Sequence, residues 1–246
     1  MQDSHDPRLD LSVVRTRYND PLIYASADNW HRFTAEEIQR EIGRLWDSIL
    51  TRTDSVILNA GSGGNDLGLL PRNTINLDIS ERRIRTSSRP LVASVEAIPL
   101  KNESVDILLC VGSVVNYCDV AIAISEFERV LRPEGILVLE FESSKSAEFI
   151  KQDIFGRSAA VAETFFGNQA EAVWVYSPTY VRNLLSAAGF SAWHQTAIHI
   201  LSPWILLLLR NVNAAALIGR LDRVARHVGF LNRFASNHLV FYQKGT

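Results

Sequence analysis

The sequence has few cysteines and no excess of charge of either sign. Cys110 and Cys118 are its only two cysteines, and they lie in neither a CxxC pair nor a His/Cys cluster. This excludes a zinc site and a disulfide framework, so we predict no bound metal. The 25 Lys and Arg residues against 27 Asp and Glu residues give a net charge of -2. Because nonspecific phosphate binding needs a basic excess, we also predict no nucleic-acid partner.

The sequence also lacks the hydrophobic segments that direct a chain into a membrane. Its longest apolar run, from Trp204 to Leu209, is far shorter than the roughly 20 residues that span a bilayer. The first ten residues, MQDSHDPRLD, are polar and acidic, without the basic start and apolar stretch of a secretory signal. Together with the cysteine content, these features predict a soluble, cytoplasmic protein.

Short apolar runs rich in β-branched residues alternate with helical patterns along the chain. Such runs are typical of buried parallel strands. Apolar residues at helical spacing between 120 and 131 predict a crossover helix. The pattern therefore predicts an α/β fold, a doubly wound sheet with helices on both faces, and strands at residues 55–60, 74–79, 91–95, 105–111 and 136–141.

The two ends of the chain differ from this regular pattern. Residues 1–33 show no clear periodicity and predict an irregular arm that precedes a domain spanning 34–246. Thr34 and Glu37 form a capping box, which predicts that a helix begins at Thr34. Near the other end, a helix after Ser177-Pro178 is followed by two predicted strands, 190–200 and 238–244, which would form a terminal hairpin around an insertion at about 201–236.

A glycine-rich turn, LNAGSGGND at residues 58–66, follows the first predicted strand. Glycine adopts positive φ and lets the backbone approach a ligand closely, and open α/β sheets bind ligands at this edge. Asp78 ends the second strand, 17 residues after Gly61, where a carboxylate can accept hydrogen bonds from both ribose hydroxyls. The dinucleotide-binding fingerprint would need a third glycine where Asp66 stands, which argues against a pyrophosphate on this turn.

Four motifs in order resemble class I S-adenosylmethionine-dependent methyltransferases. They are LNAGSGG, the acid of NLDIS, SVEAIPLKNESVD and FERVLRPEGILVLE, and they cover roughly residues 50–145. The resemblance implies a Rossmann-like seven-stranded sheet, mostly parallel with an antiparallel last strand. It also implies S-adenosyl-L-methionine as cofactor, and methyl transfer to oxygen or nitrogen of a small-molecule or lipid-like acceptor.

The resemblance assigns cofactor contacts by position. Gly61 and Gly63 would pass beneath the methionine part, Asp78 would hold the ribose, and Ser94 with Val95 would meet the adenine. Where Asn59 and Ser94 stand the family usually has acids, but each keeps an oxygen that accepts a hydrogen bond. The full predicted set is Asn59, Gly61, Ser62, Gly63, Asp78, Ile79, Ser94, Val95, Glu96, Val111 and Gly112.

Methyl transfer from a sulfonium chiefly needs alignment and exclusion of water, so few residues are obligatory. A base would assist a hydroxyl or ammonium acceptor, and the candidates are Tyr117, Glu142 and His194. Each candidate also has a structural interpretation without a catalytic role. Tyr117 would belong to a capping loop, Glu142 would be a solvated carboxylate at a strand end, and His194 would be a structural histidine. The aromatic-rich residues 143–176 form either an acceptor pocket or a helix and loop that close the core.

The insertion combines apolar and basic residues on opposite sides of a predicted helix. Beside Trp204, this is the profile of an interfacial membrane helix and would suit a lipid-like acceptor. A lid on the active site and a homodimer contact are equally open interpretations of the 203–228 segment. The basic residues are Arg220, Arg223, Arg226 and His227, and the apolar ones are Leu217, Ile218, Leu221, Val224, Ala225 and Val228.

Two further alternatives concern the activity itself. A cofactor-binding protein of the same fold without catalysis is left open by Asn59 and Ser94. A nicotinamide-dependent oxidoreductase would share the glycine-rich turn and the acid at Asp78, but Asp66 argues against it.

Overall fold

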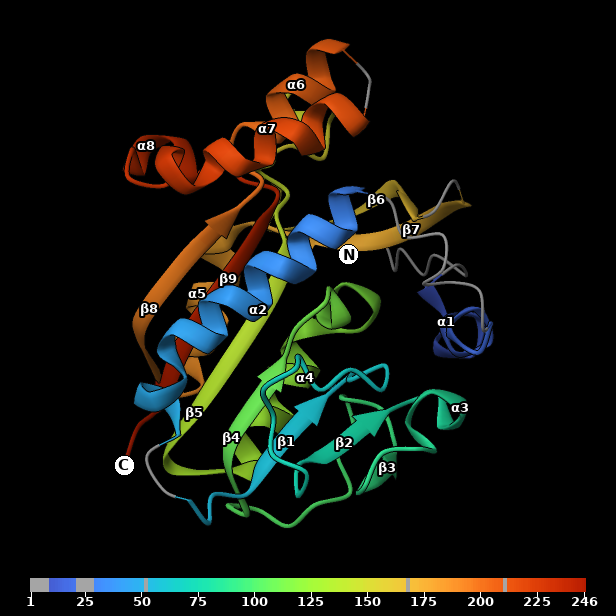
Figure 1. The fold of residues 1–246 in the computed structure, drawn as a ribbon, viewed down its shortest axis with the longest axis vertical. Coiled ribbons are helices and arrows are strands. Elements are labelled where there is room, and N and C mark those ends of the chain that lie inside the picture. Colours follow the sequence, from blue (N-terminus) through green and yellow to red (C-terminus); the bar gives the residue numbers. More distant parts are fainter. Residues whose placement is uncertain (1–8, 21–28, 51–52, 167–168, 210–211) are drawn as a thin grey trace.

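A seven-stranded sheet forms the centre of the computed structural model, which describes residues 9–20, 29–50, 53–166, 169–209 and 212–246 (Figure 1). The strand order is β3-β2-β1-β4-β5-β9-β8. Neighbours from β3 to β5 pair in parallel, whereas β9 runs antiparallel to both β5 and β8. This confirms the predicted doubly wound sheet with its antiparallel last strand. The bounds are β1 Ile57–Ala60, β2 Ile75–Asp78, β3 Pro90–Val92, β4 Val105–Cys110, β5 Leu131–Glu142, β8 Phe190–Ile198 and β9 Asn237–Lys244.

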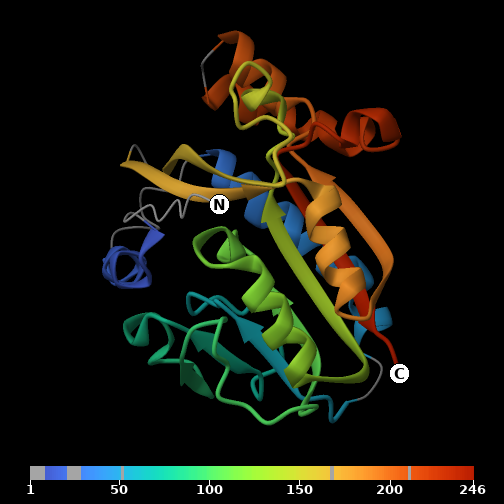
Figure 2. The same cartoon turned by 180° about the vertical axis from the view of Figure 1, so that it is seen from behind.

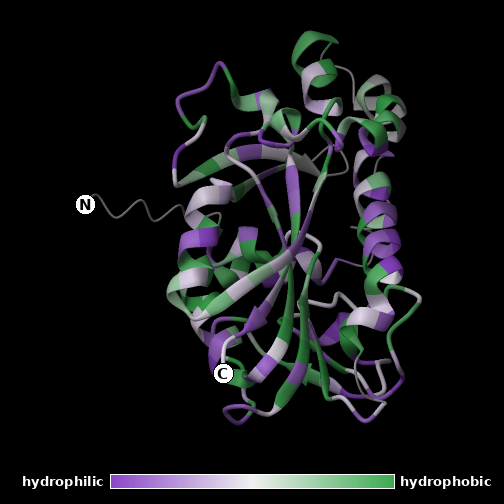
Figure 3. Ribbon diagram, turned by 90° about the vertical axis from the view of Figure 1, so that its left-hand side faces the viewer, coloured by the Kyte–Doolittle hydropathy of each residue, from purple (hydrophilic) through white to green (hydrophobic). Residues whose placement is uncertain are grey.

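Helices cover both faces of the sheet. Helix α2 (Asn29–Ile49) lies on one face, and α4 (Val120–Val130) and α5 (Pro178–Ala187) lie on the other (Figures 1 and 2). Alternate residues of a strand point to opposite faces, so Leu58 packs with α4 and its neighbour Ile57 packs with α2. Because both of their faces are buried, the central strands β1 and β4 are mainly apolar, whereas polar residues interrupt the outer strands; Figure 3 shows this mixture of colours in the sheet.

The described part of the amino-terminal arm is helical, so the prediction of an irregular arm is wrong there. Helix α1 (Leu11–Tyr18) begins after Asp10, whose side chain accepts a hydrogen bond from the backbone N–H of Ser12. Helix α2 begins at Asn29, not at Thr34. The Thr34 hydroxyl instead donates to the carbonyl of Trp30 one turn back, and tertiary partners occupy Glu37, so the capping pattern is not used.

The segment 143–176 forms a β-hairpin where a helix and loop were one expectation. Strands β6 (Ala159–Phe166) and β7 (Gln169–Tyr176) pair antiparallel in a separate two-stranded sheet. A short helix, η4 (Ala147–Phe149), precedes them, and Phe149 packs with Val173 and Val175 of the hairpin. Two further short helices, α3 (Glu81–Ile84) and η3 (Val114–Tyr117), follow β2 and β4.

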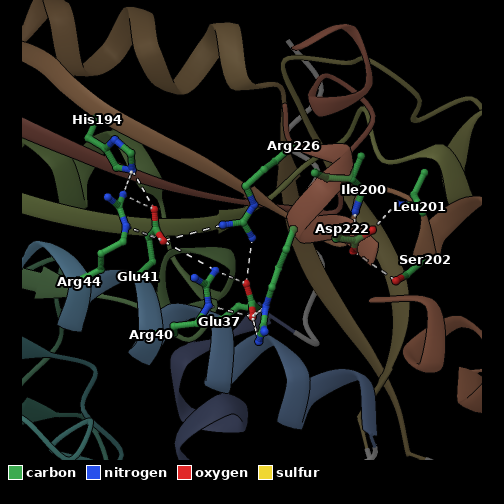
Figure 4. A network of polar contacts seen from close by, with 11 residues as sticks. Glu37, Arg40, Glu41, Arg44, His194, Ile200, Leu201, Ser202, Asp222 and Arg226 are labelled. Carbon is green, nitrogen blue, oxygen red and sulfur yellow. Dashed lines mark hydrogen bonds and ion pairs between the residues drawn. The ribbon is translucent and has the colours of Figure 1, made fainter. Parts of the chain in front are cut away.

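The predicted insertion lies between β8 and β9 and consists of α6 (Ser202–Leu209), α7 (Val212–Ala225) and α8 (Gly229–Asn232). Two of its basic residues bind the buried Glu37 carboxylate of α2, from which the guanidinium groups of Arg223 and Arg226 lie 2.7 and 2.9 Å away. Arg226 is mostly buried by this contact (Figure 4), whereas half of the Arg223 side chain remains exposed. Apolar side chains at Leu221, Val224 and others also face solvent.

Length and hydropathy together rule out a membrane-crossing helix within the described residues.

Candidate active site

Two adjoining pockets lie at the carboxyl ends of β1, β2 and β4. The strand order reverses between β1 and β4, which is where open α/β sheets bind ligands. Both pockets are lined by Tyr18, Gly61, Gly112 and Tyr117, so they form one elongated site. Ten of the eleven predicted cofactor contacts line it; Glu96 is the exception.

The glycine-rich turn has the geometry that the sequence predicted. Gly61 has a φ of +70°, and a Cβ atom added there would lie 2.4 Å from a methyl carbon of Val114. Gly63 also has positive φ, 54°, and its backbone N–H donates to Asp78 Oδ2 at 2.8 Å. The turn after β1 is thus held against the end of β2, and side chains are excluded where the two pockets meet.

Asp78 is buried at the end of β2 and is fixed by two backbone groups. Its Oδ1 accepts from the N–H of Ser80 at 2.8 Å, and its Oδ2 from the N–H of Gly63. Burial raises the pKa of Asp78, and these two hydrogen bonds oppose the rise. Since each carboxylate oxygen can accept more than one hydrogen bond, both can still receive ligand hydroxyls.

One end of the site is narrow and mostly apolar. Ile79, Ser94 and Val95 line it from the sheet side, whereas Leu11 and Val14 of helix α1 cover it. Glu96 lies outside the lining. Its Oε1 accepts from the N–H of Asp119 at 2.7 Å and Oε2 lies 3.5 Å from the Ser94 hydroxyl, so it braces the adjoining loop.

The other end is wider and more polar. Ser62, Gly63 and Val111 line it together with Asn59, whose amide nitrogen donates to the carbonyl of Asn65 at 2.8 Å. This bond anchors the asparagine within the glycine-rich turn. The α2 residues that line this end include His31, Thr34 and Ile38, so the first face-covering helix also forms a wall of the site.

Sequence reasoning missed Glu140, which holds the loop after β4. Its carboxylate is fully buried and accepts from the N–H groups of Gly112 and Ser113 at 3.0 and 2.5 Å, and from the Asn237 side chain at 2.7 Å. Ser113 has a left-handed φ of 60°, a conformation unfavourable for a residue with a side chain. A glutamate inside the apolar run ILVLEF was the signal that could have revealed this role.

Tyr117 connects three separate segments at the middle of the site. Its hydroxyl donates to Glu171 Oε2 on β7 at 2.9 Å, and its ring meets that of Tyr18 edge to face at 5.5 Å. Arg17 of α1 forms an ion pair with the same Glu171 oxygen at 3.1 Å. Burial and the neighbouring Tyr18 and Glu171 raise the pKa of Tyr117 well above its ordinary value. Tyr117 is therefore a neutral hydrogen-bond donor and is poorly suited to act as a base.

Glu142 ends β5 and lines the wide end of the site. It also lines a neighbouring cavity of about 620 Å³ between α2, the β6–β7 hairpin and α6. Burial, reinforced by repulsion from Glu140, raises the pKa of Glu142 to about 8. A carboxyl group with such a pKa, at the junction of two cavities, is able to exchange a proton near neutral pH.

His194 does not lie at this site. It stands on β8 and lines neither of the two pockets nor the neighbouring cavity. Its Nε2 lies 3.0 Å from Glu41 Oε1, and its ring packs edge to face on Phe241 (Figure 4). Tyr117 and Glu142 thus line the same site, whereas His194 takes part in the contacts between α2 and the sheet.

Comparisons with known proteins agree with this geometry. Residues 58–139 match a family model described as a methyltransferase domain. Malonyl-[acyl-carrier protein] O-methyltransferase of Yersinia pestis is 33% identical over 132 residues, which are 48% of this chain and 49% of that protein. An uncharacterised protein of Methanocaldococcus jannaschii is 27% identical over 124 residues, covering 48% and 46% of the two chains. The chain thus spans about half the length of the curated relatives it matches.

Solved structures share the fold at low sequence identity. The 1,6-didemethyltoxoflavin-N1-methyltransferase of Burkholderia thailandensis, solved with 1,6-didemethyltoxoflavin and S-adenosylhomocysteine, superposes with a TM-score of 0.60 at 13% identity, covering 98% of this chain and 91% of that one. A SAM-dependent methyltransferase structure from Methanosarcina mazei gives a TM-score of 0.54 at 13% identity, covering 82% and 97%.

Proposed function

We propose that the chain is a class I S-adenosylmethionine-dependent methyltransferase, and that it transfers a methyl group from S-adenosyl-L-methionine to oxygen or nitrogen of a small-molecule or lipid-like acceptor. The observation that carries the proposal is the position of Asp78. Its buried carboxylate lies at the carboxyl end of β2, next to the switch point of the sheet and beside a glycine turn that excludes side chains.

The residues present fit the cofactor. Gly61 and Gly63 leave room for its methionine part, and Asp78 offers two carboxylate oxygens to the ribose hydroxyls. Ser94 and Val95 line the narrow, apolar end, where a flat base would be sandwiched beneath helix α1. We assign Asn59, Ser62, Ile79, Val111 and Gly112 to the same set, and Glu96 to a supporting position behind Ser94.

When bound, S-adenosylmethionine supplies a methyl group made electrophilic by its sulfonium. The chain's own part is to align the acceptor and to exclude water. Helix α1 closes the site from one side, and Tyr117 holds Glu171 at the other. Glu142 stands where the acceptor would enter and is our candidate for the group that takes its proton.

Replacing Asp78 tests the placement of the cofactor. We expect Asp78→Ala to weaken S-adenosylhomocysteine binding at least about 100-fold, since two hydrogen bonds to a charged acceptor are lost and each contributes about 1.5–3 kcal/mol. Isothermal titration calorimetry measures the change, and Asp66→Ala, an exposed acid on the same turn, is the matched control. Equal affinity of Asp78→Ala and wild type would show that the site lies elsewhere.

The same titrations separate the remaining activities. A nicotinamide-dependent oxidoreductase would bind NAD in preference to S-adenosylmethionine, and a cofactor-binding protein without catalysis would bind S-adenosylmethionine but would not turn over with any acceptor. We expect S-adenosylmethionine and S-adenosylhomocysteine to bind with micromolar affinity and NAD not to bind. Preference for NAD would overturn the proposal.

We also propose that residues 34–246 form the methyltransferase domain and that residues 1–33 act as an arm over the cofactor, of which α1 and the first residues of α2 are described. For the insertion, peripheral membrane contact and homodimer contact remain separate proposals. Both are supported by exposed apolar side chains at Leu208, Leu209, Leu221, Val224, Val228 and Phe230. Sedimentation with anionic liposomes tests the first, and the absence of binding at low salt would refute it. Analytical ultracentrifugation tests the second.

A further inference from the structure

The cavity beside the methionine end of the site is where an acceptor would lie. It has a volume of about 620 Å³, which is within the range of small-molecule sites. It shares His31, Thr34, Ser113, Glu142 and Glu171 with the wide pocket. A ligand in this cavity would therefore reach the methyl group without crossing the cofactor.

The charged lining of this cavity is predominantly acidic. Four carboxyl groups line it, from Glu142, Glu148, Glu163 and Glu171, against two basic side chains, Lys151 and His31. Glu171 is only 8% exposed. Its arginine partner, Arg17, approaches from helix α1 and is not part of the cavity lining.

Apolar side chains also line the cavity, namely Trp30 of α2, Phe149 of η4, and Leu206 and Leu207 of α6. A carboxylate or phosphate on the ligand would be repelled by those acids that are ionised, whereas a cation would compensate them. Glu171 already has a partner in Arg17, which leaves the other three acids for such a cation. An apolar body would meanwhile cover the aromatic and leucine side chains. The lining thus selects for a ligand that is both cationic and apolar.

We propose that this cavity binds an apolar amine as its ammonium ion, and that Glu142 takes the proton that the nitrogen must lose before it is methylated. The inference rests on the proposed function and narrows it from oxygen or nitrogen to nitrogen. The acidic, partly buried surroundings also raise the pKa of Glu142, because burial and the negative neighbours Glu140, Glu171 and Glu148 disfavour its charged form.

The chemistry balances without a further reactant. Above its pKa of about 8, Glu142 is a carboxylate and can accept a proton. The ammonium then gives one proton to this carboxylate, and the freed nitrogen lone pair forms the new N–C bond as the S–C bond of the donor breaks. S-adenosylhomocysteine leaves as a neutral thioether, and the methylated amine carries the positive charge that the sulfonium held. The proton on Glu142 then passes to solvent.

A charge series of one ligand body tests the proposal. The probes are tryptamine, its alcohol tryptophol and the acid indole-3-propionate, each titrated calorimetrically into protein saturated with S-adenosylhomocysteine at about pH 9, where Glu142 is ionised. We expect tryptamine to bind at least about 10-fold more tightly than either analogue, which corresponds to about 1.4 kcal/mol. Glu142→Gln should weaken tryptamine binding by a similar factor and leave tryptophol unaffected. Lys151→Gln, which removes the opposite charge from the same cavity, should not weaken tryptamine binding.

The outcomes separate this inference from the proposed function. Three results would each overturn the amine assignment. They are equal or tighter binding of the alcohol or the acid, an unchanged tryptamine affinity in Glu142→Gln, and no detectable tryptamine binding at concentrations up to about 10 mM. Tighter binding of indole-3-propionate would favour a carboxylate acceptor instead. Failure of the protein to bind S-adenosylhomocysteine would refute the proposed function itself.

Discussion

Glu142 should make the protein less stable as the pH rises, and Glu142→Gln should remove this effect. Burial and repulsion from Glu140 raise the pKa of Glu142 from 4.5 to about 8 in the folded protein. A carboxyl group whose pKa is higher in the folded state binds its proton more tightly there. The resulting stabilisation is fully present below the unfolded pKa and is lost as the pH rises through about 8. The glutamine variant is neutral at every pH and has no such dependence.

The difference between the pKa of Glu142 in the folded and in the unfolded protein sets an upper limit on the loss of stability with rising pH. Since each pKa unit is worth about 1.36 kcal/mol, the rise corresponds to about 5 kcal/mol. Glu142 lines two cavities that solvent can enter, so its charge is partly solvated and we expect about 2–3 kcal/mol of this limit to be observed. Wild type should therefore lose about 2–3 kcal/mol of unfolding free energy relative to Glu142→Gln between pH 5 and pH 9.

Urea unfolding of both proteins at several pH values between 5 and 9 measures this difference. Comparison with the variant cancels the titration of most other groups. Glu163→Gln is the matched control, since this glutamate lines the same cavity but is exposed, and its replacement should change the unfolding free energy little. A constant difference between wild type and Glu142→Gln would refute the account of the buried acidic cavity.

Two further predictions concern the glycine turn and the insertion. Gly61→Ala should weaken S-adenosylhomocysteine binding at least about 10-fold, because the new Cβ would lie 2.4 Å from a Val114 methyl carbon and a φ of +70° is strained for alanine. Calorimetry would measure the affinity, and an unchanged value would contradict this geometry of the turn. Glu37→Gln should lower the unfolding free energy by about 2–4 kcal/mol, since it leaves Arg226 with only its longer contact to Glu41, at 3.8 Å. Urea unfolding measures it, and Glu36→Gln on the exposed side of the same helix is the control.

The parts of the site that lie close together in sequence could be predicted from it. The glycine turn and Asp78 each end a strand, and their roles depend on backbone conformation and on the edge of the sheet they occupy. The predicted strands and the terminal hairpin around the insertion follow from apolar patterning in the same way. Such features are local, so a single sequence records them directly.

The remainder of the site depends on contacts between distant segments. Glu171 meets Tyr117 and Arg17 only because a hairpin follows β5 and α1 folds back over the pockets. The prediction that a helix begins at Thr34 failed for the same reason. Its capping partner Glu37 is instead occupied by two arginines more than 180 residues away, and no local pattern contains that information.

The ion pairs between α2 and the insertion mean that neither segment can be removed or exchanged independently of the other. Deleting α6 to α8 would leave the buried Glu37 and Glu41 carboxylates without Arg226. Transplanting the insertion into a related domain with uncharged residues at these positions would leave its arginines uncompensated. A chimaera should therefore fold well only when both acids of α2 are transferred together with the insertion, although they lie some 160 residues earlier in the chain.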